Sequence, residues 1–382
     1  MGLTQQLVSK EILTSEHISC VKKEEFKFED GFSSAAIHKV VPKDSHGAGI
    51  SVLTIGDPHF RTENLNDIPV YIARIEYLVK LEKPTFVVIL GDLLHCHERV
   101  HTTVLNKAYT FIHKIRKLAP LYVLVGNHDY INNSQFLTTH HWMNAMKEWS
   151  NVTIVDTGMV STTPYGKFIF CPYVFPGKFE TALNIIDTEW KSARTIFCHQ
   201  EFYGCRMGAI ESVEGDKWDP CSPFIISGHI HDKQRIQTNI FYTGSSIQHA
   251  FGESQDKTIT MCHFDENIHL ESIDLNLPRK KILYMNMEEV VKFEPVESEH
   301  KLRITLSGTY DEFKVFKKSK KYKSLVENNI KVVYRHKTLP GDELATDVAV
   351  NNDFYNILLT LVKEEQNSDM MNIYNEIFSE RV

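Results

Sequence analysis

From Ile50 onward, short runs of β-branched and other apolar residues alternate with longer segments in which apolar residues recur at helical spacing. The first three runs are Ile50–Ile55, Thr85–Leu90 and Leu121–Val125, and the segments between them are Val70–Val79 and Val104–Leu118. Runs of this length fit strands, and an intervening helix is the usual link between parallel strands. The alternation therefore predicts a βαβαβ unit with a parallel central sheet, which is an α/β fold.

Later apolar runs follow with shorter connections and predict a second sheet with antiparallel content: Lys167–Cys171, Thr195–Cys198, Phe224–Ser227, Ile240–Thr243 and Thr258–Phe264. We expect the two sheets to sandwich one core. After Pro278, a strand, a helix and a strand are predicted over 301–306, 311–327 and 330–334, which indicates a separate α+β unit. The sequence therefore predicts four parts: an N-terminal extension over 1–48, a main domain over 49–278, a small domain over 279–345 and a helical segment over 346–382.

The composition is typical of a globular protein that stays inside the cell. With 382 residues, 42% hydrophobic and 24% charged, the chain can bury two or three cores. No apolar run reaches the roughly eighteen residues of a membrane span. Charged residues, such as Lys10, Glu11 and Glu16, are spread over the first thirty positions, where a signal peptide would need an apolar stretch. The seven cysteines form no Cys-x-x-Cys pair, which favours a reducing compartment. We expect a cytoplasmic protein, or a nuclear one in a eukaryotic host, with no membrane partner.

Metal-ligand residues follow the predicted strands of both sheets: Asp57 and His59, Asp92, Asn127 with His128 and Asp129, His199, and His229 with His231. The carboxyl ends of strands are where open α/β sheets place their sites. Taken singly, a histidine at a strand end is more often a capped or solvated residue, and Asp92 and Asn127 could be turn residues. The ordered set favours a site instead, because a bridging carboxylate and His-x-His can hold two divalent ions about 4 Å apart for phosphoryl transfer.

This ordered set resembles the calcineurin-like metallophosphoesterase superfamily over about residues 49–275. The resemblance implies a two-sheet αββα sandwich with a small α+β capping domain and C-terminal helices. It also implies one ion held by Asp57, His59, Asp92 and His231, and another held by Asp92, Asn127, His199 and His229. The resemblance further implies that His128 binds no metal and either protonates the leaving oxygen or stabilises the transition-state charge, and that Asp129 orients His128.

Three details are similar to the SbcD-like double-strand-break-repair nucleases in particular. His95 stands three residues after Asp92, where that family has a histidine that helps to position the phosphate and the dinuclear centre. The stretches Tyr242–Ser245 and Phe251–Glu253 are similar to the segment that closes its nuclease domain. The small domain over 279–345 stands where that family carries a capping domain that holds DNA over the metals. Protein serine/threonine phosphatases instead show Asp-Arg-Gly at the bridging carboxylate.

The small domain carries a local excess of positive charge, although the whole chain has a net charge of -7. Fifteen Lys and Arg stand against eight Asp and Glu between Arg279 and Lys337. The candidate DNA-binding residues lie on or beside one predicted helix: Lys314, Lys317, Lys318, Lys320, Lys321 and Lys323. A solvated helix face is the open alternative for such a lysine run. We expect His97, Arg99, His101 and His249 to be surface or supporting groups.

The resemblance thus implies an enzyme: a dinuclear-metal-dependent DNA nuclease that acts in recombination and double-strand-break repair. A metal-bridging hydroxide would attack the phosphodiester, with His128 as the general acid. The expected activities are 3′ to 5′ exonuclease on duplex ends and endonuclease on single strands, with two Mn²⁺, or Mg²⁺ or another divalent ion, as cofactors. Two alternatives stay open: a phosphoesterase for a small phosphodiester or a phosphoprotein, and a catalytically silent scaffold that binds DNA ends.

The expected partners, besides DNA, also come from the resemblance. An SbcC-like coiled-coil ABC ATPase would bind the helices of 346–382, and a homodimer would form through the helices near 70–79 and 104–118. The C-terminal helices could equally pack on their own capping domain. No Gly-x-x-x-x-Gly-Lys-Ser/Thr loop occurs, so any use of ATP would come from the partner.

Overall fold

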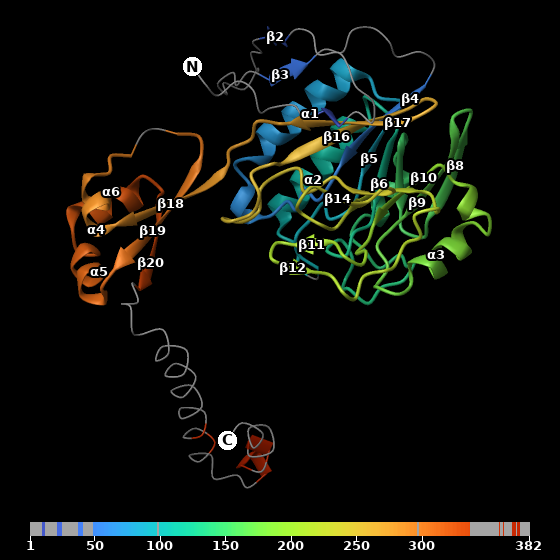
Figure 1. Cartoon of the computed structure of the whole chain (residues 1–382). Helices are drawn as coiled ribbons and strands as arrows, with labels where there is room; N and C mark the ends of the chain where they lie inside the picture. The colour runs from blue at the N-terminus through green and yellow to red at the C-terminus, as the bar shows by residue number, and fades with distance from the viewer. Residues whose placement is uncertain are drawn as a thin grey trace. The chain divides into compact units, whose positions relative to one another are not determined.

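The computed structural model describes residues 49–97, 99–295 and 298–336, short strands within the first 48 residues, and single helical positions at 359, 362, 369–371 and 373–374. The chain divides into two compact units (Figure 1). The larger unit comprises Met1–Lys281 with Glu299–Lys301, and the smaller comprises Ile282–Ser298 with Leu302–Val382. The helices predicted for 346–382 lie outside the described residues, apart from those single positions.

The first sheet of the larger unit is built around the predicted parallel strands. Its order is β1 (Lys10–Glu11), β17 (Ile268–Asp274), β16 (Thr258–Phe264), β4 (Ile50–Ile55), β5 (Phe86–Ile89), β6 (Leu121–Leu124) and β7 (Val152–Val155). Strands β4 to β7 are parallel, and β16 pairs antiparallel with β4. The helices α1 (Ile68–Glu82) and α2 (Thr102–Ile115) link β4 to β5 and β5 to β6. The predicted βαβαβ unit is confirmed.

The second sheet is parallel at its centre and antiparallel only at its edges. Its order is β14 (Gln234–Gln237), β15 (Ile240–Tyr242), β13 (Phe224–Gly228), β10 (Thr195–His199), β9 (Gly166–Cys171) and β8 (Met159–Thr163). Only β14 and β8 pair antiparallel with their neighbours. The prediction that 258–264 belongs to this sheet was wrong, because β16 returns across the molecule and pairs with β4.

Shorter elements complete the larger unit. The helix α3 (Phe179–Ile186) packs on the second sheet, and a hairpin is formed by β11 (Arg206–Met207) and β12 (Ile210–Glu211). Three turns of 3-10 helix are η1 (Thr62–Asn64), η2 (Asn144–Glu148) and η3 (Trp190–Ser192). In the N-terminal extension, β2 (Val21–Glu24) pairs with β3 (Ile37–Val40).

Apolar side chains from the facing sides of the two sheets form the central core. Val52, Phe86, Phe170 and Phe197 are buried in it, and the last two rings stack with centroids 5.2 Å apart. Truncation of one such ring to alanine is expected to cost about 3–5 kcal/mol. Further clusters lie between the first sheet and α1 and α2, and between the second sheet and α3. The predicted αββα sandwich is therefore confirmed (Figure 1).

The smaller unit is a three-stranded sheet with three helices. Its elements are β18 (Lys280–Asn286), α4 (Met287–Lys292), β19 (Lys301–Gly308), α5 (Tyr310–Phe316), α6 (Lys320–Glu327) and β20 (Lys331–His336), and β19 lies in the middle of the sheet. The single helix predicted over 311–327 was wrong. The chain turns at Lys317 and Lys318, and the side chain of Ser319 accepts a hydrogen bond from the backbone of Tyr322 and so begins α6.

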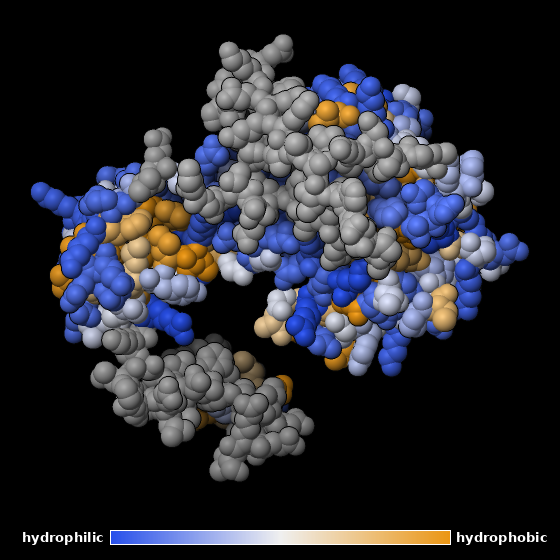
Figure 2. Space-filling view, turned by 45° about the horizontal axis from the view of Figure 1, so that its top comes forward, coloured by the Kyte–Doolittle hydropathy of each residue, from blue (hydrophilic) through white to orange (hydrophobic). Residues whose placement is uncertain are grey.

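On the face that Figure 2 shows, the described residues are mostly hydrophilic, with some apolar patches. On the smaller unit, the exposed apolar or aromatic side chains include Tyr284, Tyr310 and Val315. Among the described residues, no helix is both long enough and apolar enough to cross a bilayer.

Candidate metal centre and active site

The metal-ligand residues predicted from the sequence come together at the carboxyl ends of five strands. Asp57 and His59 follow β4, Asp92 follows β5, Asn127 follows β6, His199 ends β10, and His229 and His231 follow β13. Four of them have left-handed backbone conformations, with φ of 46° at Asp57, 42° at His59, 52° at Asp92 and 79° at His229. Such conformations are unfavourable for residues with a side chain and persist only where the surrounding structure imposes them.

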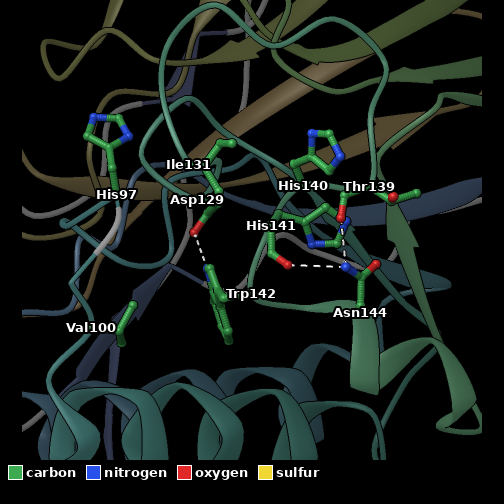
Figure 3. Close-up of a pocket in the computed structure, with 9 residues that line it drawn as sticks. All are labelled: His97, Val100, Asp129, Ile131, Thr139, His140, His141, Trp142 and Asn144. Atoms are coloured by element: carbon green, nitrogen blue, oxygen red, sulfur yellow. Dashed lines mark hydrogen bonds between the residues drawn. The ribbon is translucent and has the colours of Figure 1, made fainter.

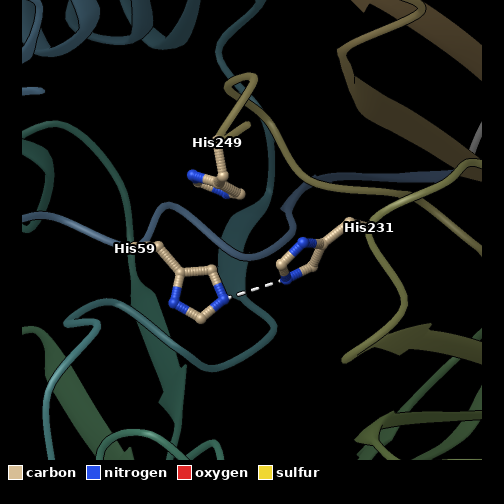
Figure 4. Close-up of side chains that lie close together, drawn as sticks. All are labelled: His59, His231 and His249. Atoms are coloured by element: carbon tan, nitrogen blue, oxygen red, sulfur yellow. Dashed lines mark hydrogen bonds between the residues drawn. The ribbon is translucent and has the colours of Figure 1, made fainter. Parts of the chain in front are cut away.

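The first group of ligand atoms gathers around His59. Its Nε2 atom lies 3.0 Å from Nε2 of His231 (Figure 4). The same Nε2 atom lies 3.4 Å from Oδ2 of Asp92. Ligand atoms of Asp57, His59 and Asp92 all lie within 4.8 Å of one another. With His231, these three residues make up the set of four that was expected to hold one ion.

The second group gathers around Asn127. Its Oδ1 atom lies 3.0 Å from Nε2 of His199 and 3.1 Å from Nδ1 of His229. Nε2 of His199 is also 3.4 Å from Oδ2 of Asp92. The same oxygen of Asp92 is therefore equally close to both groups, as a bridging carboxylate would be. Nδ1 of His199 donates to the carbonyl oxygen of Leu90 at 2.7 Å, which leaves Nε2 free to act as a ligand.

The charges of the site fit two divalent cations. Oδ2 of Asp57 is buried and has no hydrogen-bond partner, and burial raises the pKa of this carboxyl. Burial also opposes the ionisation of Asp92, but the neighbouring His199 and His59 outweigh it and hold its pKa well below its usual range. A buried carboxylate oxygen without a partner is costly unless a cation pairs with it. The mixture of carboxylate, amide and imidazole ligands suits Mn²⁺, Fe²⁺ or Zn²⁺.

Two glycines bring the loops close enough to form this site. A Cβ atom on Gly126 would lie 2.2 Å from Oδ1 of Asp92. A Cβ atom on Gly91, where φ is +105°, would lie 2.5 Å from Nδ1 of His199. Both distances are far below van der Waals contact, so only glycine fits at these two positions.

His128 lies against the metal ligands between two other imidazoles. Its ring stacks on those of His95 and His97, with centroids 5.1 and 4.7 Å away and interplanar angles of 13° and 17°. Its Nδ1 donates to the carbonyl oxygen of His95 at 2.8 Å, and burial lowers its pKa. Nδ1 of His95 is in turn 3.3 Å from Nδ1 of His59. The two candidate catalytic histidines thus adjoin the first group of ligands.

The carboxylate of Asp129 makes its hydrogen bonds within its loop region and not to the imidazole of His128, which the resemblance implied. This carboxylate accepts hydrogen bonds at 3.0–3.2 Å from the backbone N–H groups of Leu93, Leu94 and Gly126 and from the indole of Trp142. Burial, followed by the nearby charge of Asp92, raises the pKa of this carboxyl to about 6. Because the short Asp129 side chain turns back into its own loop, it joins the two loops that carry Asp92 and Asn127, and the carbonyl of His95 is what orients His128.

His249 and Arg61 support the site; the sequence suggested a surface or supporting group for His249 and gave no role to Arg61. His249 is only 6% exposed, and its Nε2 donates to the carbonyl oxygen of Asp57 at 2.9 Å. Its ring centroid lies 4.8 Å from that of His59 and 5.0 Å from that of His231 (Figure 4). A guanidinium N–H of Arg61 donates to the carbonyl oxygen of His249. Its position two residues after the predicted ligand His59 was the sequence signal that could have indicated a supporting role for Arg61.

A buried ion pair contacts both the backbone and the ring of His231. The fully buried ammonium of Lys257 donates to the carbonyl oxygen of His231 at 2.8 Å and lies 3.4 Å from the Glu253 carboxylate. That carboxylate is also 3.7 Å from Nδ1 of His231. Glu253 belongs to the Phe-Gly-Glu stretch noted in the sequence, whereas nothing in the sequence pattern singled out Lys257.

Two cavities adjoin the histidines of the site. The larger, of about 520 Å³, is lined by His97, Val100, Asp129, Ile131, Thr139, His140, His141, Trp142 and Asn144 (Figure 3). The smaller, of about 120 Å³, has His95 in its wall together with the basic side chains of Arg61, Arg99 and His101. His97 lines the larger cavity and His95 lines the smaller one, and both rings stack on His128.

The candidate DNA-binding lysines lie on the smaller unit and are divided between two helices. Lys314 is on α5, Lys317 and Lys318 are in the turn, and Lys320, Lys321 and Lys323 are on α6. All are exposed except Lys321, which is partly buried and pairs with Glu294 at 2.6 Å.

Comparison with known proteins agrees with this site. Residues 50–233 match the model of the calcineurin-like phosphoesterase family. The chain is 48% identical over 282 residues to the protein named phosphoesterase 244L of Invertebrate iridescent virus 6, covering 70% of this chain and 98% of that protein. It is 42% identical over 330 residues to the protein named phosphoesterase 078R of Invertebrate iridescent virus 3, covering 84% of this chain and 94% of that protein.

Among solved structures, a dimetal phosphatase from Danio rerio superposes on 59% of this chain and 96% of its own, with 11% identity and a TM-score of 0.39. The family match covers every predicted metal ligand, from Asp57 to His231. The chain belongs to the calcineurin-like phosphoesterase family and is a metal-dependent phosphoester hydrolase.

Proposed function

We propose that this hydrolase is a DNA nuclease of the SbcD-like type that uses two Mn²⁺ ions, with Mg²⁺ or another divalent ion as a possible substitute. The ligands would be those of the two groups around His59 and Asn127, with Asp92 shared. When bound, the ions activate the attacking water and neutralise charge on the phosphoryl oxygens. The remaining steps fall to side chains of this chain.

In this proposal, His128 donates a proton to the leaving oxygen. Its Nδ1–H is held by the carbonyl oxygen of His95, so Nε2 is the nitrogen left to face a substrate. The flanking rings of His95 and His97 restrict rotation of the imidazole. A general acid needs this fixed direction, since proton transfer depends on hydrogen-bond distance to the leaving group.

The observation that carries the choice of DNA is the basic cavity beside His95. A polynucleotide presents another phosphate on each side of the scissile one, whereas a simple phosphoester does not. The cavity of about 120 Å³ is lined by Arg61, His95, Arg99 and His101, and Glu63 is the one acidic residue in its lining. Planar guanidinium groups suit phosphate recognition. These features support a substrate with a second phosphate close to the first.

The test is degradation of an end-labelled DNA duplex and of a single-stranded circle by the purified chain in Mn²⁺ and in Mg²⁺, with His128→Ala as the control. Shortening from the 3′ end and nicking of the circle in Mn²⁺, both lost in the variant, are expected. Hydrolysis of bis(p-nitrophenyl) phosphate without any cleavage of DNA would contradict the proposal.

A hydrolase for a small phosphodiester or a phosphoprotein is the second candidate. The cavity of about 520 Å³ favours it, because a compact leaving group would fit there beside His97 (Figure 3). The ring of His97 stacks on that of His128. An Arg99→Gln variant separates the two. It is expected to raise KM for DNA and to leave KM for bis(p-nitrophenyl) phosphate unchanged; equal KM changes would favour the small substrate.

The partners are part of the same proposal. We propose that segment 346–382 binds an SbcC-like coiled-coil ABC ATPase, and that two copies of the chain associate through α1 and α2. Deletion of 346–382 should then abolish co-purification with the ATPase while Mn²⁺-dependent cleavage of the single-stranded circle persists. Retained co-purification would contradict the assignment of this segment.

A further inference from the structure

The two histidines of the His-x-His motif face different groups of ligands, and each does so with a different ring nitrogen. Nδ1 of His229 lies 3.1 Å from Oδ1 of Asn127 and 3.3 Å from Nε2 of His199. Nε2 of His231 lies 3.0 Å from Nε2 of His59 (Figure 4). The other nitrogen of each ring, Nε2 of His229 and Nδ1 of His231, is therefore left for a supporting contact.

A carboxylate lies beside each of these remaining nitrogens. Oε1 of Glu253 is 3.7 Å from Nδ1 of His231, and Oε2 of Glu201 is 3.9 Å from Nε2 of His229. Glu253 also compensates the charge of the buried Lys257 at 3.4 Å, so its removal would disturb more than the histidine. Glu201 therefore isolates the contribution of such a carboxylate more cleanly.

A loop over 202–215 holds the carboxylate of Glu201 in place. Its Oε1 accepts a hydrogen bond from the hydroxyl of Ser212, which is buried and itself accepts one from the backbone N–H of Gly215 at 3.1 Å. The backbone carbonyl of Glu201 accepts a further hydrogen bond from the N–H of Asp216 at 3.0 Å. The hairpin of β11 and β12 lies within this loop (Figure 1). One carboxylate oxygen is thus fixed, and the other faces His229.

The position of the proton on His229 explains what a carboxylate contributes there. A neutral imidazole that binds a cation through Nδ1 carries its proton on Nε2. A carboxylate beside Nε2 stabilises this form and makes the ligating nitrogen more basic. The backbone N–H of His229 donates to Oδ1 of Asp57 at 2.9 Å, and the ring centroid of Tyr173 lies 5.8 Å from that of His229. These two contacts hold the backbone and flank the ring, and Glu201 fixes the direction of the ring.

We propose that Glu201 is a positioning residue for the ion of the second group, because it holds the imidazole of His229 with Nδ1 toward Asn127 and His199. Glu201 acts through His229 and not as a ligand itself. The inference rests on the metal-dependent hydrolysis of phosphoesters and holds whether or not the substrate is DNA. Loss of this carboxylate should therefore weaken the binding of one ion and spare the other.

The competing explanation is that Glu201 only ties the loop together through Ser212. Glu201→Gln separates the two roles, since the amide oxygen can still accept the hydrogen bond from Ser212, while the amide nitrogen cannot accept one from Nε2–H of His229. Glu214→Gln is the matched control, because Glu214 is exposed in the same loop and the same substitution removes the same charge. Urea unfolding of the metal-free proteins checks that each variant is folded.

Binding of Mn²⁺ to the full chain is measured by titration calorimetry. Glu201→Gln is expected to raise the dissociation constant of one ion by about 10- to 100-fold and to leave that of the other ion unchanged. Electron paramagnetic resonance provides a spectroscopic readout, because two Mn²⁺ ions in one centre couple magnetically and a single bound ion does not. At a Mn²⁺ concentration that fills both sites of the wild type, Glu201→Gln should show the uncoupled signal, whereas Glu214→Gln should show the coupled one.

The location of the retained ion tests the assignment to the second group. Crystals of Glu201→Gln are prepared at a Mn²⁺ concentration that just fills both sites in wild-type crystals. Anomalous scattering is expected at the group around His59 and is expected to be lost at the group around Asn127. Scattering that remains at the Asn127 group and is lost at the His59 group would overturn the inference.

The outcomes separate this inference from the proposed function. Lower metal-free stability of Glu201→Gln, combined with wild-type affinity for both ions, would reduce Glu201 to a loop residue and refute the inference alone. If Glu201→Gln does not fold, Ser212→Ala takes its place: it keeps the carboxylate but releases Oε1, and it should weaken the same ion by a smaller factor. Unchanged Mn²⁺ affinity in folded Ser212→Ala would then overturn the inference. A wild type that binds only one Mn²⁺ would refute the two-ion centre, and with it both this inference and the proposed nuclease mechanism.

Discussion

Replacing Asp129 by asparagine is expected to loosen both loops that carry the bridging part of the metal centre. The carboxylate accepts four hydrogen bonds, two on each oxygen. Asparagine can keep two of them, because its amide nitrogen is itself a donor and would face two N–H groups. A hydrogen bond to a charged group contributes about 1.5–3 kcal/mol, so Asp129→Asn should lower the free energy of unfolding by about 3–6 kcal/mol.

The same change should weaken metal binding. Leu93 and Leu94 follow Asp92 directly, and Gly126 precedes Asn127, so the lost hydrogen bonds adjoin two ligands. Loss of a partner that orients ligands typically costs about 10- to 100-fold in metal affinity. We therefore expect the dissociation constant for Mn²⁺ to rise by about that factor.

Urea unfolding followed by tryptophan fluorescence measures the stability of the metal-free protein, and titration calorimetry measures Mn²⁺ binding. Asp156→Asn is the matched control. Asp156 is also buried and accepts hydrogen bonds from His141 and Lys147, neither of which is a predicted metal ligand. It should lower stability and leave Mn²⁺ affinity unchanged. Wild-type stability and metal affinity in Asp129→Asn, combined with slow turnover, would refute the loop role and favour orientation of His128.

The remaining predictions concern the proposed general acid His128, the close packing of Gly126 against Asp92, and the buried carboxylate of Asp156. His128→Ala should retain both metal ions by elemental analysis and lose cleavage by a factor on the order of 10² or more; unchanged cleavage would remove His128 from the reaction. Gly126→Ala should lower the metal content, since the added Cβ would lie 2.2 Å from Oδ1 of Asp92, and a full complement of metal would contradict this packing. Burial opposes ionisation of Asp156, but hydrogen bonds from His141 and Lys147 lower its pKa. Its contribution to stability is therefore present above the unfolded-state value of about 3.9 and is lost as pH falls through the lower folded-state value. Urea unfolding should show the gap between wild type and Asp156→Asn shrinking below about pH 4, and a constant gap would contradict this.

The sequence was most informative where a strong local signal coincided with burial. The runs 50–55 and 258–264 became β4 and β16 with the predicted bounds, because runs rich in β-branched and other apolar residues suit a strand buried on both faces. The strands β7, β8 and β17 were missed, since they are short or mix polar residues with apolar ones. Which sheet β16 joins depends on contacts with β4 more than two hundred positions away, and no local pattern encodes them.

The candidate ligands could be predicted because each has its own motif at a strand end, and the structure brings them together as two groups around Asp92. The contacts of the supporting residues could not be predicted in this way. Lys257 acts through the backbone of His231, and His249 through the backbone of Asp57, so neither contact needs a sequence motif. The direction of the Asp129 carboxylate depends on loop geometry, which motif resemblance does not specify.

The ligands of this centre are far apart along the chain, and that spacing has a consequence for folding. His59 and His231 lie 172 positions apart, and His199 comes from a strand in the other sheet than Asp92. The two ions can therefore bind only after both sheets have docked, so metal should act late in folding and affect unfolding more than refolding. Saturating ions should raise the melting temperature of the whole larger unit in a single transition, because a ligand that binds only the assembled state stabilises everything that assembly requires.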